Sequence, residues 1–130
     1  DAGAERALLS GADRRNLLAR LVPQLDAAGL IALRDRAQAI TASTALLDYL
    51  QGLLTASRRH AEIRVGLSPR AGLSLLAAAK AWALLSGRGH VLPEDLQALF
   101  VPLAGHRLVP SRGSSGEALA RELLAEVAVD

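Results

Sequence analysis

Apolar residues recur at intervals of three and four along most of the chain, the spacing that places them on one side of an α-helix. Alanine, leucine, arginine and glutamate are abundant, and all four favour helices. Alternating apolar and polar positions, the pattern of a half-buried strand, do not extend over a useful length. The sequence therefore predicts an all-α fold, a small helical bundle around one core.

The first 25 residues predict one or two short helices, which end at Pro23. Ser10 and Asp13 have the spacing of a capping box, whose side chains satisfy free N–H groups at a helix start. A helix over residues 27–37 follows. Beyond the capping candidates Thr41, Ser43 and Thr44, we expect a longer helix that extends to about residue 58. Its apolar stripe contains Leu46, Leu47, Leu50, Leu53 and Leu54.

Residues 61–67 are expected to form a loop before the most apolar helix of the chain. Ser68 is a suitable N-cap, and Pro69 suits the first helical position because its missing N–H is no loss there. The helix over residues 69–86 is apolar on nearly every side, which predicts that it is buried at the centre of the bundle. Gly87 then supplies a left-handed residue that ends it.

A short extended link at residues 90–92 precedes another helix, which Pro93 begins and which has Glu94 and Asp95 at its positive end. This helix stops near residue 105. Its buried side should contain Leu96, Leu99, Phe100 and Leu103. The only β structure that we expect is one very short extended pairing around residues 90–92 and 107–109.

The remaining residues form a small polar linker, 111–116, and a last helix that extends to about residue 127. Ser114 and Glu117 have capping-box spacing at its start. We therefore expect a helical domain over residues 1–110, followed over residues 111–130 by a linker and a C-terminal helix. That helix is expected to dock on the domain or on a neighbouring subunit.

Composition limits what this chain does. Its 130 residues allow one domain and one core. The absence of cysteine excludes disulfides and thiolate metal sites, and the absence of methionine suggests a piece of a longer protein. The net charge is only +2 and arginines are interspersed with acids, which favours a mixed surface over a nucleic-acid footprint. No signal peptide and no membrane-spanning run are apparent.

The chemistry of a complete enzyme is not evident in these residues. No Gly-x-Ser-x-Gly elbow, no cysteine nucleophile and no phosphate-binding Gly-rich loop ending in Lys-Ser/Thr is present. The three histidines, His60, His90 and His106, lie far apart and show no metal-binding spacing, so we expect no metal site. The chain by itself is therefore not expected to be an enzyme.

Arg70 stands out because it lies in the first turn of the apolar helix, a position that is already positive and usually favours acids. Free N–H groups and a guanidinium at that end can together bind a phosphate. The competing interpretation is an arginine that points to solvent or pairs with a neighbouring carboxylate. The residues alone leave both interpretations open.

An ordered set of motifs over residues 4–108 resembles the C-terminal lid of MoxR-type AAA+ ATPases. The central block consists of Gly66 to Ala71, Leu75-Leu76, residues 79–85, Gly87-Arg88, Val91-x-Pro93-x-Asp95 and His106-Arg107-Leu108. The opening Ala4-Glu5-Arg6, the helix containing Asp48-Tyr49, and Arg58 also fit. The resemblance stops at residue 108, so it carries no expectation for the residues beyond it.

This resemblance implies an upstream ATPase core that holds the phosphate-binding loops and Mg²⁺, with residues 1–25 as the connector from that core. Arg70 matches the sensor-2 arginine, which reaches the γ-phosphate of ATP, and Ser68 and Pro69 would position it beside the nucleotide. The implied parent is a cytoplasmic, chaperone-like ATPase that forms a homo-oligomeric ring and remodels or matures client proteins. No role follows for Arg58, Arg88, His106 or Arg107.

Two other functions remain open from the sequence. A stand-alone helical adaptor would bind a partner protein through its apolar surface without any nucleotide. A helical DNA-binding domain would present a cluster of arginines on one face, and its affinity would fall steeply with salt. The lid hypothesis instead predicts Mg²⁺-dependent ATP hydrolysis once the upstream core is present.

Overall fold

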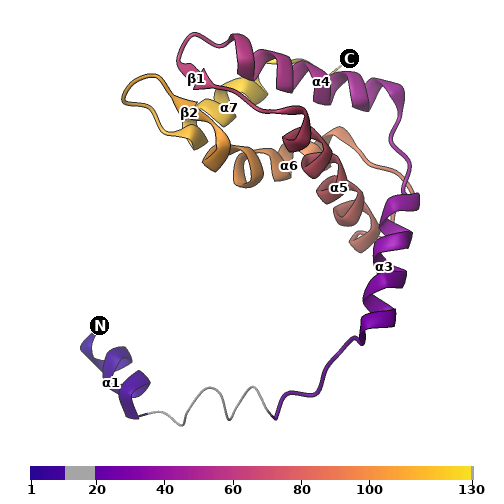
Figure 1. Ribbon diagram of the computed structural model, residues 1–130, viewed down its shortest axis with the longest axis vertical. Helices are drawn as coiled ribbons and strands as arrows, with labels where there is room; N and C mark the ends of the chain where they lie inside the picture. The colour runs from indigo at the N-terminus through magenta and orange to yellow at the C-terminus, as the bar shows by residue number, and fades with distance from the viewer. Residues whose placement is uncertain (11–19, 130) are drawn as a thin grey trace. The chain divides into compact units, whose positions relative to one another are not determined.

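The computed structural model describes residues 1–10 and 20–129 (Figure 1). The helices are α1 (Ala2–Ser10), α3 (Ala27–Ala39), α4 (Thr44–Arg59), α5 (Pro69–Leu85), α6 (Pro93–Ala104) and α7 (Gly116–Glu126). A 3₁₀ turn, η1 (Gly105–Arg107), and two strands, β1 (Ile63–Val65) and β2 (Val109–Pro110), complete the list. Because the strands contain only three and two residues, the all-α prediction is confirmed.

Two compact units, Asp1–Ile31 and Ala32–Asp130, divide the chain. In the first unit, the carboxylate of Asp1 accepts the N–H of Gly3 at 3.0 Å, and the carboxylate of Asp26 accepts the N–H of Gly29 at 2.7 Å. These acids satisfy N–H groups at the starts of α1 and α3. The predicted capping box of Ser10 involves Asp13, which lies outside the described residues.

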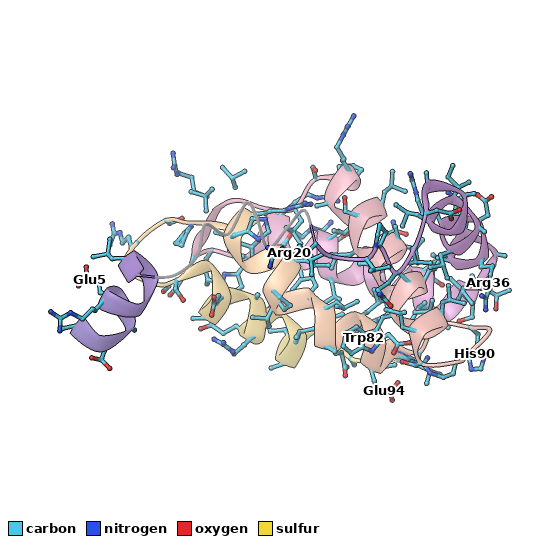
Figure 2. All side chains as sticks on the ribbon, turned by 90° about the horizontal axis from the view of Figure 1, so that it is seen from below. Glu5, Arg20, Arg36, Trp82, His90 and Glu94 are labelled. Carbon is cyan, nitrogen blue, oxygen red and sulfur yellow. The ribbon has the colours of Figure 1, made fainter. Side chains whose placement is uncertain are left out.

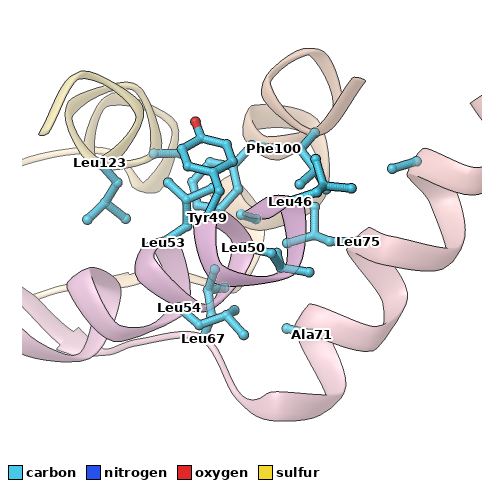
Figure 3. Packing of buried hydrophobic residues seen from close by; sticks show 14 of the residues in the cluster. Leu46, Tyr49, Leu50, Leu53, Leu54, Leu67, Ala71, Leu75, Phe100 and Leu123 are labelled. Carbon is cyan, nitrogen blue, oxygen red and sulfur yellow. The ribbon is translucent and has the colours of Figure 1, made fainter. Parts of the chain in front are cut away.

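The core of the second unit is centred on α4 (Figure 3). Ser43 is the residue that caps this helix, since its hydroxyl accepts the N–H of Leu46 at 3.1 Å. The predicted stripe is buried except at Leu47, which is 42% exposed. The buried members face side chains of α5, α6 and α7, namely Ala71, Leu75, Phe100 and Leu123. The hydrophobic pattern therefore located the core correctly in this helix.

The prediction of a fully buried helix at residues 69–86 is wrong. The buried residues of α5 form one stripe: Ala71, Gly72, Leu75, Ala79 and Ala83. The rest of the helix is not buried in this way: Leu76 and Leu84 are only partly buried against the core, and Leu73 is 69% and Leu85 82% exposed. Trp82, labelled in Figure 2, is 47% exposed. Alanine and leucine are helix formers as well as core residues, so an apolar surface did not by itself specify burial.

Helices α6 and α7 pack against each other and close the core. Leu96 and Phe100 of α6 are fully buried, as are Leu119, Ala120 and Leu123 of α7. The cap of α7 differs from the prediction: Ser115, not Ser114, accepts the N–H of Ala118 at 3.1 Å. The hydroxyl of Ser114 instead donates to Glu62 at 3.1 Å, a tertiary contact that the local pattern could not reveal.

Both segments expected to form an extended pairing do pair, but with other partners. Val109 and Pro110 of β2 lie antiparallel to β1, with Val109 opposite Val65. His90 forms an isolated bridge with Thr41, whose C=O accepts the N–H of Val91 at 2.9 Å. The expected loop over residues 61–67 therefore contains a strand, which is too short to show an alternating pattern.

A left-handed glycine and an ion pair fix the connection from α5 to α6. Gly87 has φ +73°, as predicted, and the N–H of Arg88 reaches back to the C=O of Ala83 at 2.9 Å. The guanidinium of Arg88 then donates two hydrogen bonds to Asp95, at 2.7 and 2.6 Å. Asp95 is only 4% exposed and also accepts the N–H of Leu92. The pKa of Asp95 is lowered, mainly because the hydrogen bonds from Arg88 stabilise its charged form. Burial alone would raise this pKa, but its effect is smaller.

We expect Leu123→Ala to lower the free energy of unfolding by about 2–5 kcal/mol, because it removes a fully buried side chain between α7 and the core. Leu85→Ala is the matched control, since Leu85 also lies on a helix but is 82% exposed, and we expect a change within about 0.5 kcal/mol. Urea unfolding of both variants measures the difference. Equal effects would contradict the docking of α7.

We expect Asp95→Asn to lower the free energy of unfolding at pH 7 and to make this free energy depend less on pH in the acidic range. Asp95 has a lower pKa in the folded chain, so its contribution is complete above pH of about 4 and is lost as the pH falls through the folded pKa. Urea unfolding at pH 7 and pH 3 tests this. Glu94→Gln is the control, because Glu94 is the exposed neighbour of Asp95. A wild-type pH dependence in Asp95→Asn would show that Asp95 is not the source of the acid-dependent stability.

Candidate functional site

The start of α5 has the local structure that the sequence predicts. Ser68 is extended, at φ −79° and ψ 161°, and its hydroxyl accepts the N–H of Ala71 at 3.3 Å. Pro69 occupies the first helical turn. The side chains of Ser68, Pro69 and Arg70 are all exposed. The remaining free N–H groups of this turn therefore lie at the protein surface, at the positive end of a helix of 17 residues.

A buried serine holds the segment that leads into this helix. Ser57, at the end of α4, is fully buried, and its hydroxyl donates to the C=O of Leu54 at 2.7 Å. The same oxygen accepts the N–H of Leu67 at 2.9 Å. Arg58 adds a bond from its Nε to the C=O of Leu67 at 3.0 Å. Both backbone polar groups of Leu67, a buried residue, are thus satisfied by the end of α4.

Gly66 permits this close approach of two chain segments. A Cβ atom at residue 66 would lie 2.5 Å from the backbone oxygen of Ser57 and 2.9 Å from the Cα of Arg58. Backbone atoms cannot yield as the end of a flexible side chain can, so any larger residue would push the segment away. The position of the α5 start therefore depends on a glycine at residue 66.

Arg70 extends into solvent from this fixed helix start. Its guanidinium has no hydrogen-bond or ion-pair partner among residues 1–10 and 20–129, and the first turn of α5 contains no acid. The open depression beside it has a volume of about 490 Å³. It is lined by Val65, Gly66, Leu67, Ser68, Arg70, Ala71, Ser74 and Arg107. No carboxylate is among these lining residues, so the depression is electropositive.

Sequence reasoning left four residues without a role, and the structure places each of them. Arg58 holds the backbone of Leu67, and Arg88 pairs with Asp95. Arg107 lines the same depression as Arg70, although 37 residues separate them, and its Nε donates to the ring of His106 at 3.4 Å. Ser57 was not noticed at all. The pattern that could have revealed Ser57 is its position one turn after Leu53 and Leu54, where a polar residue continues the apolar stripe of α4.

The histidines belong to different elements. Nε2 of His60, at the end of α4, lies 3.7 and 3.9 Å from carboxylate oxygens of Glu122 and Glu126 on α7, while His90 and His106 are exposed. Within the described ranges, no group of three histidine, cysteine or acidic residues could hold a metal ion. None of the described helices is long and apolar enough to cross a membrane.

Comparison with known proteins identifies the domain that carries this helix start. Residues 55–127, more than half of the chain, match the AAA lid domain family. The chain belongs to that family. Its relatives show that it is a lid of the MoxR type of AAA+ ATPase. The matched range includes both the depression and α7.

The lid is 29% identical over 127 residues to the Bacillus subtilis protein YeaC, covering 94% of this chain and 40% of YeaC. It is 33% identical over 95 residues to the chaperone MoxR1 of Mycobacterium tuberculosis, covering 66% of this chain and 24% of that protein. Over 98 residues it is 38% identical to MoxR of Paracoccus denitrificans, covering 64% and 29%.

A solved structure agrees with these sequence relatives. The crystal structure of a candidate ATPase from Cytophaga hutchinsonii superposes with a TM-score of 0.74 at 25% identity. The match covers 79% of this chain and 36% of the other. The lid thus spans less than half the length of every relative described here.

We expect Ser57→Ala to lower the free energy of unfolding by about 1–3 kcal/mol, because the buried N–H of Leu67 would lose its acceptor. The exposed hydroxyl of Ser74 donates to the backbone of Arg70, so Ser74→Ala is the control, with an expected change within about 0.5 kcal/mol. Urea unfolding gives both values, and hydrogen exchange at Leu67 should be faster only in Ser57→Ala. Unchanged exchange there would show that Ser57 does not hold the segment.

Proposed function

We propose that this lid couples the binding and hydrolysis of ATP in its parent ATPase to movement of the lid, with Arg70 as the sensor-2 arginine. In this role the guanidinium of Arg70 contacts the γ-phosphate, and Ser68 and Pro69 fix the turn from which it extends. The observation that carries the proposal is the exposed Arg70 guanidinium, which has no partner within the described ranges, beside a depression without a lining carboxylate.

The chemistry of the depression supports phosphate as the ligand. A helix N-terminus offers N–H donors and positive potential, and an arginine can form two parallel hydrogen bonds to phosphate oxygens. The pairing of Arg70 with a neighbouring carboxylate, the alternative that the sequence left open, finds no support in the contacts of the described residues. When the γ-phosphate leaves, Arg70 loses its partner. The lid position that this contact stabilised is then less favoured, and the equilibrium between lid positions shifts.

The residues at this site do not fit Mg²⁺. That ion prefers oxygen ligands, commonly carboxylates, whereas this depression presents two arginines and two serine hydroxyls. We therefore assign Mg²⁺ and the remaining phosphate contacts to the ATPase core of the parent protein. In the reaction, the part played by this chain is to bind and orient the terminal phosphate and to stabilise its negative charge.

The partners that we propose follow from the family and from the surface of α5. The exposed side chains Leu73, Trp82 and Leu85, which lie on different sides of α5, give the lid apolar contact points for its own ATPase core and for neighbouring subunits of a homo-oligomeric ring. MoxR1 is named a chaperone, and we extend a chaperone-like action on client proteins to the parent of this lid. A cytoplasmic location belongs to the same proposal. Family membership favours this function over the adaptor and the DNA-binding domain.

We expect Arg70→Ala, introduced into the parent chain with its core, to lower the turnover of ATP about tenfold or more, since charge stabilisation by an arginine is a large part of phosphoryl transfer. Arg112→Ala is the matched control, because Arg112 is exposed but does not line the depression. Steady-state hydrolysis with Mg²⁺ measures both. Turnover at the wild-type rate in Arg70→Ala would remove the basis of the proposal.

A further inference from the structure

The depression beside α5 contains a second arginine that comes from a distant part of the chain. Arg70 lies in the first turn of α5, and Arg107 is the last residue of η1. Both line the depression, and its other lining residues are apolar or are serines and a glycine. Two guanidinium groups at one surface repel each other, and this repulsion is relieved when an anion binds between them.

The backbone that carries Arg107 is held firmly. Residues on either side of η1, Ala104 and Leu108, are buried, and the N–H of Leu108 donates to the C=O of Ala104 at 3.1 Å. Gly105 packs so closely on α7 that a Cβ there would lie 3.2 Å from the Cα of Glu117. Packing in the core therefore fixes the backbone position of Arg107, and the hydrogen bonds of Ser57 likewise fix the segment that leads to Arg70.

The side chain of Arg107 is nevertheless free to bind a ligand. It is exposed, and its one hydrogen bond among the described residues is the 3.4 Å bond from Nε to His106. That bond leaves the two terminal nitrogens available. By contrast, Arg88 uses its terminal nitrogens on Asp95, and Arg121 uses one on Glu117 at 3.3 Å. Structural pairing, which accounts for Arg88, does not account for Arg107.

We propose that Arg107 is a second phosphate-binding residue, which with Arg70 holds the terminal phosphate of a nucleoside triphosphate. This inference rests on the function proposed above and adds a specificity to it: two arginines facing one terminal phosphate favour a triphosphate over a diphosphate. The function proposed above is tested by the turnover of Arg70→Ala, and the present inference by the preference of Arg107→Ala for ATP over ADP.

The test measures the dissociation constants of ATP and ADP for the parent chain with its core, by calorimetry in the presence of EDTA so that hydrolysis is suppressed. We expect Arg107→Ala to weaken the binding of ATP about tenfold, the usual effect of losing a charged hydrogen bond, and that of ADP less than twofold. Arg107→Lys should restore part of the preference, because lysine keeps the charge without the planar fork.

The controls separate this inference from the function on which it rests. Arg112→Ala removes an exposed arginine elsewhere and should leave both constants unchanged. If Arg70→Ala lowers turnover but Arg107→Ala keeps the wild-type ratio of the ATP and ADP constants, the inference is overturned and the proposed function stands. If neither substitution changes its readout, both fail. Should Arg107→Ala unfold, Arg107→Gln replaces it and is judged by the same ratio.

Discussion

A single buried hydroxyl group joins the end of α4 to the start of α5, and the site depends on it. The hydroxyl of Ser57 donates to the C=O of Leu54 and accepts the N–H of Leu67, so it satisfies one backbone group on each side of the junction. The backbone of residue 66 lies so close to that of Ser57 and Arg58 that only glycine fits there. Arg58 completes the hydrogen bonding of Leu67. The orientation of the first turn of α5, and with it the direction of Arg70, follows from these contacts.

Arg107, the other arginine that lines the depression, is held by a separate set of contacts. Buried residues of α6 and α7 hold η1, and the ion pair of Arg88 with Asp95 fixes the turn between α5 and α6. Helix α7 therefore helps to hold Arg107 in place, although the motifs that first suggested the lid family end at Leu108. The two arginines reach one surface through independent sets of buried contacts.

Local chemistry made the helix boundaries predictable from the sequence. Ser68-Pro69, Gly87 and Pro93 each act through their own backbone, so their effects could be read without knowledge of the fold. The partners of Ser57, Arg107 and the two strands lie far along the chain, and no local pattern encodes such contacts. The exposure of α5 was mispredicted for a related reason. An apolar helix surface can be buried, but the sequence does not show whether another element covers it.

The length of α5 gives the lid a mechanical property. Arg70 lies at one end of this 17-residue helix, and the glycine turn at residue 87 lies just past the other. Such a helix is a rod of about 25 Å, so a rotation of about 10° at the Arg70 end displaces the far end by about 4 Å. Under the proposed function, a small adjustment of Arg70 around a leaving phosphate would in this way be amplified into a larger displacement at the far end of α5.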